Sequence, residues 1–321
     1  MAMSTRRYDP LGFPVPIDFE SDAAVGPGLS DAGGSLPTRG PGGLPRGRAG
    51  RGKRLFLLAV LGACVVPAVI GPAILPEIRD GVVRFSLWRS AAFEVEDEAA
   101  AAAAEIDRAI LWHGDDAELY CLRGRLLLEA RDPAAAIRDA DRAAALDPRG
   151  SEPLRLRAIA HVSLGDADAA LADAKKAVSL AGEGDPSGLN FRAYIRAVVG
   201  REIPEGLRDI ERALNATGDA SPELLDTHGF LLHLAGRQDE ALATMELAID
   251  GMRQSRRQLV FMAGQLGRTE FARRLRSVDH AIAVMLHHRG LIHEADGRGR
   301  QAAEDFEMAR RKGFDPTRGI F

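Results

Sequence analysis

Small and apolar residues recur along this chain at a spacing of 34 positions. The stretches 117–150 and 151–184 each carry two helix-length patterns that are separated by a short polar break. Positions that match across the spacing are Tyr120 and Leu154, Gly124 and Ala158, Ala136 and Ala170, Ala140 and Ala174, and Ala143 and Ala177. Internal periods of this length predict an all-α fold of helical hairpins, in which each hairpin buries its apolar face against its neighbours.

Within these two stretches the pattern predicts helices at 118–129, 133–146, 152–164 and 168–180. Gly124 and Ala158 stand where only a small side chain allows the two helices of a hairpin to approach closely. The alanines of each second helix allow it to pack against the next hairpin in the same way.

The same pattern returns clearly at 222–255 and 283–316, and in weaker form at 186–218, where it fits only with one extra residue near Ile203. Residues 258–280 have a helical pattern that is out of register with the repeats, so we expect irregular pairing there. Upstream, 77–116 is predicted to form a helical lead-in or half repeat, because Ala102, Ile106 and Ala109 within 90–112 fit the second helix of a preceding unit.

This arrangement resembles the tetratricopeptide repeat family, which has an aromatic residue or Leu at the fourth place, small residues at the eighth, twentieth and twenty-seventh, and Pro near the end. The resemblance covers 117–321. It implies a helical-hairpin solenoid whose first helices line a groove for peptides or partner helices. Carried over position by position, the groove residues are Cys121, Arg125, Leu128, Glu129, Arg155, Ile159, Val162, Asp226, Phe230, His233, His287, Leu291 and Glu294.

Phe230 is the best single anchor among these positions, because an aromatic side chain offers a large contact area at low entropic cost. Packing of Phe230 against a neighbouring helix is an equal alternative. Chaperone-binding members of the family carry a clamp of Lys, Asn and Arg for a terminal carboxylate. The corresponding places here hold Cys121, Arg125 and Leu156, so the resemblance does not imply a ligand of that class.

The part of the chain before the repeats has a different composition. Residues 1–53 are rich in Gly and Pro and end in a basic cluster, so we expect a disordered tail. Residues 55–75 form a run of 21 residues without a charge, which as a helix would measure about 32 Å, close to the thickness of a bilayer core. We therefore predict one transmembrane helix over 54–76.

Six basic residues precede this run without an accompanying acid, which predicts a cytoplasmic N-terminus and repeats outside the cytoplasm, at the inner membrane of a bacterial cell. Two alternatives are weaker. A cleavable signal peptide fits poorly with a lead of 54 residues. A lipoprotein anchored through Cys64 is suggested by Leu61-Gly62-Ala63-Cys64, but the apolar run continues beyond that cysteine.

The sequence offers little chemistry. None of the eight histidines pairs with another at the spacing of three or four that a helical metal site requires. No nucleophile elbow or phosphate loop is present, and we expect no cofactor and no enzymatic activity. The formal net charge of −4 and the lack of a basic stripe in the repeats argue against nucleic acid as a partner.

These observations lead to a hypothesis of a membrane-tethered scaffold or adaptor that binds a protein or peptide partner through its groove. The alternative is a structural or assembly subunit of a membrane complex, which would self-associate or brace the complex without binding peptides.

Overall fold

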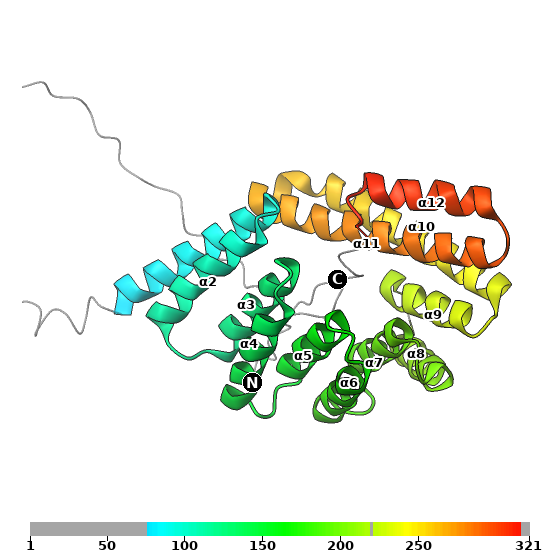
Figure 1. Ribbon diagram of the computed structural model, residues 1–321. Helices are drawn as coiled ribbons and strands as arrows, with labels where there is room; N and C mark the ends of the chain where they lie inside the picture. Colours follow the sequence, from blue (N-terminus) through cyan, green and yellow to red (C-terminus); the bar gives the residue numbers. More distant parts are fainter. Residues whose placement is uncertain (1–75, 219–220, 316–321) are drawn as a thin grey trace, which may run out of the picture. The chain divides into compact units, whose positions relative to one another are not determined.

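The computed structural model describes residues 76–218 and 221–315, and these residues are helical apart from short connections (Figure 1). Residues 83–315 belong to one compact unit, which contains all the repeats. After a helix over 76–95 come α2 (Ala99–His113), α3 (Ala117–Glu129), α4 (Pro133–Leu146), α5 (Glu152–Ser163), α6 (Ala167–Ala181), α7 (Pro186–Val199), α8 (Ile203–Thr217), α9 (Pro222–Leu234), α10 (Gln238–Phe261), the 3₁₀ turn η2 (Ala263–Gln265), α11 (Arg268–Ala295) and α12 (Gly299–Arg311). The prediction of an all-α fold is confirmed.

Consecutive helices pack against each other throughout the series from α2 to α12. In addition, α3 contacts α5, α5 contacts α7, α7 contacts α9, and α9 contacts α11. The first helices of successive hairpins therefore form a continuous row, which can be followed in Figure 1. We call α3, α5, α7, α9 and the C-terminal half of α11 the first-helix row.

Polar caps define where several helices begin. The Asp132 carboxylate accepts a hydrogen bond from the backbone N–H of Ala135 at 2.9 Å, and Asp166 and Asp185 cap α6 and α7 in the same way. Each cap satisfies one backbone donor that the first helical turn leaves unpaired. At the other end, Gly200 adopts a left-handed conformation that ends α7.

Small residues at the predicted positions allow the helices to approach closely. A Cβ atom on Gly124 would lie 2.5 Å from Leu156 Cδ2, and one on Gly290 would lie 2.5 Å from the ring of Phe306. The alanines of the second helices are buried, among them Ala136, Ala170 and Ala241. At Gly290 the tight contact lies within the hairpin, as predicted, whereas the closest contact at Gly124 is with α5 of the next hairpin and α4 of its own hairpin follows at 3.3 Å.

An arginine–aspartate pair that the sequence analysis did not identify recurs inside the hairpins. Arg157 donates from Nε and Nη2 to the two carboxylate oxygens of Asp173, at 2.7 Å each, and so joins α5 to α6. Equivalent bidentate pairs join Arg123 to Asp139, Arg192 to Asp209, and Arg289 to Asp305. In the fourth hairpin, His228 stands at the position of the arginine and Thr244 at the position of the aspartate.

Two parts of the fold depart from the simple period. The lead-in over 90–112 contains a turn at 96–97, so this region consists of the C-terminal part of the 76–95 helix followed by α2. This turn places Asp97 in a left-handed conformation, with φ of 63°. The out-of-register stretch 258–280 contains the end of α10, the turn η2 and the first half of α11. These helices have 24 and 28 residues, whereas α3 to α9 have 12 to 15.

The predicted transmembrane helix over 54–76 and the tail over 1–53 lie outside the described residues, except for residue 76. Among the residues that the structure does describe, we find no helix with both the length and the apolar character needed to cross a bilayer.

Candidate functional site

The thirteen residues predicted to line a groove all lie on the first-helix row, but they differ in exposure. Toward its N-terminal end, Cys121, Leu128 and Val162 are half-buried and pack on an apolar cluster that contains the buried Ile159. Burial raises the pKa of the Cys121 thiol, and nearby carboxylates add to this effect. Cys121 is therefore a neutral packing residue at physiological pH and does not supply a thiolate.

Two arginines on the row are held by neighbouring side chains. Arg155 is buried, donates from Nη1 to Ser187 Oγ at 3.1 Å, and places its guanidinium 4.7 Å from the centre of the Phe191 ring. Arg125 lies 3.7 Å from a carboxylate oxygen of Glu94. Both guanidinium groups are thereby fixed in position along the row before any ligand arrives.

A polar and aromatic cluster occupies the row where α7, α9 and α11 meet. His288 Nδ1 lies 2.8 Å from Asp226 Oδ1, and the imidazole stacks on Phe230 with ring centres 4.2 Å apart. Asp226, Phe230 and His288 are all buried. Tyr194 from α7 is half-buried beside them, and its pKa is raised by burial and secondarily by the carboxylate of Asp226.

Two atoms of this region are buried without a hydrogen-bond partner among the described residues. They are the side-chain oxygen of Asn190, one helical turn before Tyr194 on α7, and Nε2 of His288; Nδ1 of His293, farther along α11, is also buried without a partner, and its Nε2 lies 3.8 Å from Asp305 of α12. Buried polar atoms in proteins are almost always paired, so each unpaired one calls for a specific explanation. All three atoms belong to the first-helix row, which the sequence analysis expects to line a groove.

Sequence reasoning missed Asn190, Tyr194 and His288. Asn190 and Tyr194 occupy, in the weak third repeat, the places that Arg155 and Ile159 occupy in the second. The repeat frame could have found them, had it been applied to 186–218. His288 follows a predicted groove position directly, and its role becomes visible only because α9 brings Asp226 against it.

The remaining predicted residues lie toward the C-terminal end. His287 packs against the ring of Phe314, with centres 4.6 Å apart, and burial followed by the neighbouring His288 lowers its pKa to about 4. Leu291 packs on the cluster that contains Phe230, and His233 Nδ1 lies 2.9 Å from Gln238 Oε1. Glu294 is exposed. Of these residues, Glu294 is therefore an exposed acidic group, whereas the others contact neighbouring side chains.

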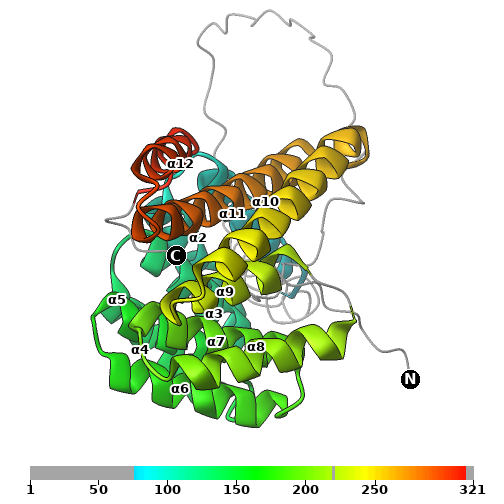
Figure 2. The same cartoon turned by 90° about the vertical axis from the view of Figure 1, so that its right-hand side faces the viewer.

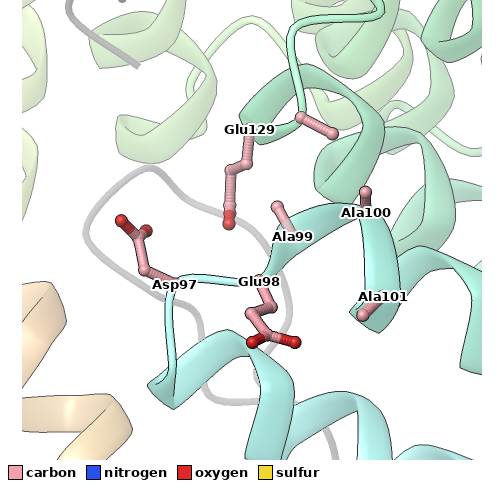
Figure 3. A pocket seen from close by; sticks show the side chains of 7 residues that line it. Asp97, Glu98, Ala99, Ala100, Ala101 and Glu129 are labelled. Carbon is pink, nitrogen blue, oxygen red and sulfur yellow. The ribbon is translucent and has the colours of Figure 1, made fainter.

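Glu129 lies at the opposite end of the row, beside an open pocket of about 430 Å³. The pocket is lined by Asp97, Glu98, Glu129, Ala130 and the alanines 99–101, and Figure 3 shows the Glu129 side chain extending from α3 toward the turn that carries Asp97 and Glu98. No group of three His, Cys, Asp or Glu side chains within 76–218 and 221–315 has an arrangement that could hold a metal ion.

Solved structures similar to this chain include tetratricopeptide repeat proteins at low sequence identity. No family model matches its sequence, and no curated protein matches it. A thermophilic tetratricopeptide repeat protein of Thermus thermophilus is 21% identical over 53% of this chain and 91% of its own, with a TM-score of 0.47. A tetratricopeptide repeat protein of Parabacteroides merdae is 16% identical over 73% of this chain and 94% of its own, with a TM-score of 0.45. The type IV pilus biogenesis factor PilW is 15% identical over 61% of this chain and 89% of its own, with a TM-score of 0.45. The order of the helices and the contacts between them define the chain as a protein of stacked helical hairpins.

Proposed function

We propose that the first-helix row binds an extended segment of a partner protein, and that the chain acts as a scaffold without enzymatic activity. The observation that carries this proposal is the pair of buried atoms without partners, Asn190 Oδ1 and His288 Nε2. Leaving a buried polar atom unpaired costs about 1–3 kcal/mol. A ligand that pairs with them recovers this energy on binding.

The chemistry of these two atoms indicates which hydrogen-bonding groups the ligand must supply. A carboxamide oxygen only accepts hydrogen bonds. In a neutral imidazole whose Nδ1–H donates to Asp226, Nε2 is also an acceptor. The site therefore needs N–H donors, and the backbone of an extended peptide supplies them at regular intervals. The ring of Phe230 and the half-buried Tyr194 add an apolar floor beside these acceptors.

An Asn190→Ala variant tests this site directly. For a peptide selected from a displayed library against the full chain, we expect the variant to bind about five- to tenfold more weakly, because one hydrogen bond is lost. Asn215→Ala makes the same chemical change at an exposed position of α8 and serves as the matched control. Fluorescence polarisation gives both dissociation constants. If Asn190→Ala and the parent chain bound the peptide with equal affinity, Asn190 would not be part of the binding site.

The second part of the proposal is that the scaffold is tethered to the inner membrane through 54–76, with the repeats outside the cytoplasm. The uncharged run over 55–75 and the basic cluster before it support this proposal. We expect a Glu294→Cys variant, exposed on α11, to react with a membrane-impermeant maleimide in intact cells. Reaction only after the cells are lysed would place position 294 in the cytoplasm and contradict the proposed orientation.

A further inference from the structure

The long hairpin formed by α10 and α11 extends beyond the core of the repeats. Figure 2 shows the two helices side by side, running away from the other hairpins. The last buried residue of α10 is Met252 and the first of α11 is Ile282, and every residue of the described stretch between them is at least partly exposed. We call residues 253–281 the overhang. Helical repeats bury residues throughout their hairpins, so packing does not explain this extension.

The tip of the overhang carries bulky apolar side chains. Val260 is 46% exposed, Phe261 is 88% exposed and Met262 is 43% exposed. These three residues are consecutive and lie at the end of α10, just before the η2 turn. Exposed apolar groups of this size at the end of a projecting element indicate an interaction surface.

The overhang is also strongly basic. It contains seven arginines and two acidic residues, so its formal charge is 7 − 2 = +5, whereas the whole chain has a net charge of −4. The rest of the chain therefore carries −4 − 5 = −9. Within the described part of the chain, positive charge therefore gathers on this projecting hairpin.

Internal ion pairs account for some of these arginines. Arg256 is bound to Asp279 at 3.0 Å, and Arg273 and Arg274 are both bound to Glu270. Arg276 donates to the backbone oxygen of Glu94, and Arg253 lies 3.4 Å from Asp250.

Arg257 and Arg268 are different, because they are exposed and have no ion-pair partner among the described residues. Arg257 precedes Phe261 by four positions, which places both side chains on the same face of α10. Arg268 is the first residue of α11, on the other side of the η2 turn. Two uncompensated positive charges therefore flank the apolar tip.

We propose that this tip docks onto an anionic lipid bilayer, with Val260, Phe261 and Met262 inserted at the interface and Arg257 and Arg268 at the headgroups. A bilayer accepts a narrow, convex apolar wedge, and its negative surface attracts the arginines. A stable protein interface needs about 800 Å² on each partner, which favours a broad surface over the end of a hairpin. A nucleic acid would engage the arginines and leave the three apolar side chains exposed. The tip is separate from the first-helix row, so its docking does not depend on peptide binding.

The test places an environment-sensitive fluorophore at the tip of the full chain. Phe261→Cys is labelled in a chain that also carries Cys64→Ala and Cys121→Ala, and the protein is reconstituted into vesicles of neutral lipid or of neutral lipid mixed with phosphatidylglycerol. Spin-labelled lipids then report contact of the probe with the bilayer. Leu247→Cys is the matched control, since Leu247 is an apolar residue of α10 that is 63% exposed and lies about 21 Å along the helix from the tip.

We expect quenching at position 261 to be at least threefold stronger in anionic than in neutral vesicles, and to fall at high salt because screening weakens surface charge interactions. The probe at position 247 should show little quenching in either lipid. Adding Arg257→Glu and Arg268→Glu should remove the anionic enhancement at position 261. Equal quenching at positions 261 and 247, or an enhancement that survives both charge reversals, would overturn the proposal. A blue shift that depends on protein concentration without lipid would overturn it as well, in favour of a second copy of the chain. Peptide affinity is measured on the labelled protein as well. If quenching fails but the peptide still binds more tightly than it binds to Asn190→Ala, the tip proposal fails and peptide binding by the first-helix row stands.

Discussion

Asp209→Ala is expected to lower the free energy of unfolding by about 3–5 kcal/mol, which is the usual cost of removing one partner of a buried ion pair. Asp209 is 4% exposed and joins α7 to α8. Its carboxylate accepts from Arg192 at 2.7 and 2.9 Å and also from Arg196. Without it, the buried guanidinium groups of Arg192 and Arg196 lose their shared carboxylate and keep as partners only the exposed Glu183 and the half-buried Glu202.

Urea denaturation followed by circular dichroism measures this effect. Asp168→Ala is the matched control, because Asp168 is bound to Arg201 in an ion pair whose aspartate side chain is 88% exposed. An exposed pair contributes little, and we expect a change of no more than about 0.5 kcal/mol for the control. If both variants shifted stability equally, the arginine–aspartate pairs would be incidental to the fold.

Gly229→Val is expected to reduce the free energy of unfolding by about 2–3 kcal/mol through overpacking. A Cβ atom at this position would lie 3.3 Å from the carbonyl oxygen of Ala241 and 3.4 Å from the backbone nitrogen of Met245. These are backbone atoms of α10 and cannot rotate away, so the two helices of the hairpin must separate. Loss of the close approach exposes the apolar contact between α9 and α10.

Gly81→Val provides the comparison for this variant. Gly81 also lies within a helix, and a Cβ atom there would meet nothing within 4 Å. Both changes replace helical Gly with the same β-branched residue, so their intrinsic helix propensities change alike. The difference in unfolding free energy between the two variants isolates the packing effect. A difference near zero would show that α9 and α10 tolerate a wider spacing.

The candidate site was only partly accessible from the sequence. The repeat frame placed Cys121, Arg155, Asp226 and Phe230 on the correct helices, because the frame specifies which helical face each position occupies. It did not reveal that Asp226 binds His288, since these residues are 62 positions apart and on different hairpins. Asn190 and Tyr194 were missed because the frame was not carried into the weak third repeat, where they occupy the places of Arg155 and Ile159 with an offset of 35 in place of 34.

The overhang, too, was only partly predictable from the sequence. The pattern over 258–280 indicated helix that did not fit the repeats, but periodicity alone cannot say where an irregular helix ends. The structure places the turn at 262–267, and so makes Phe261 the end of a projecting hairpin instead of a residue in a buried helix. Charge was countable from the sequence, whereas the pairing of some arginines and the exposure of Arg257 and Arg268 were not.

By itself, the sequence determined the fold class, the starts of most helices and the positions that require small residues, because these depend on local capping and on a spacing repeated along one chain. Only the tertiary structure decided which polar side chains meet across hairpins, which are buried without a partner, and which element projects from the core. Those properties arise from contacts between residues that are distant in sequence, and a repeat period describes each hairpin without describing what its neighbours place against it.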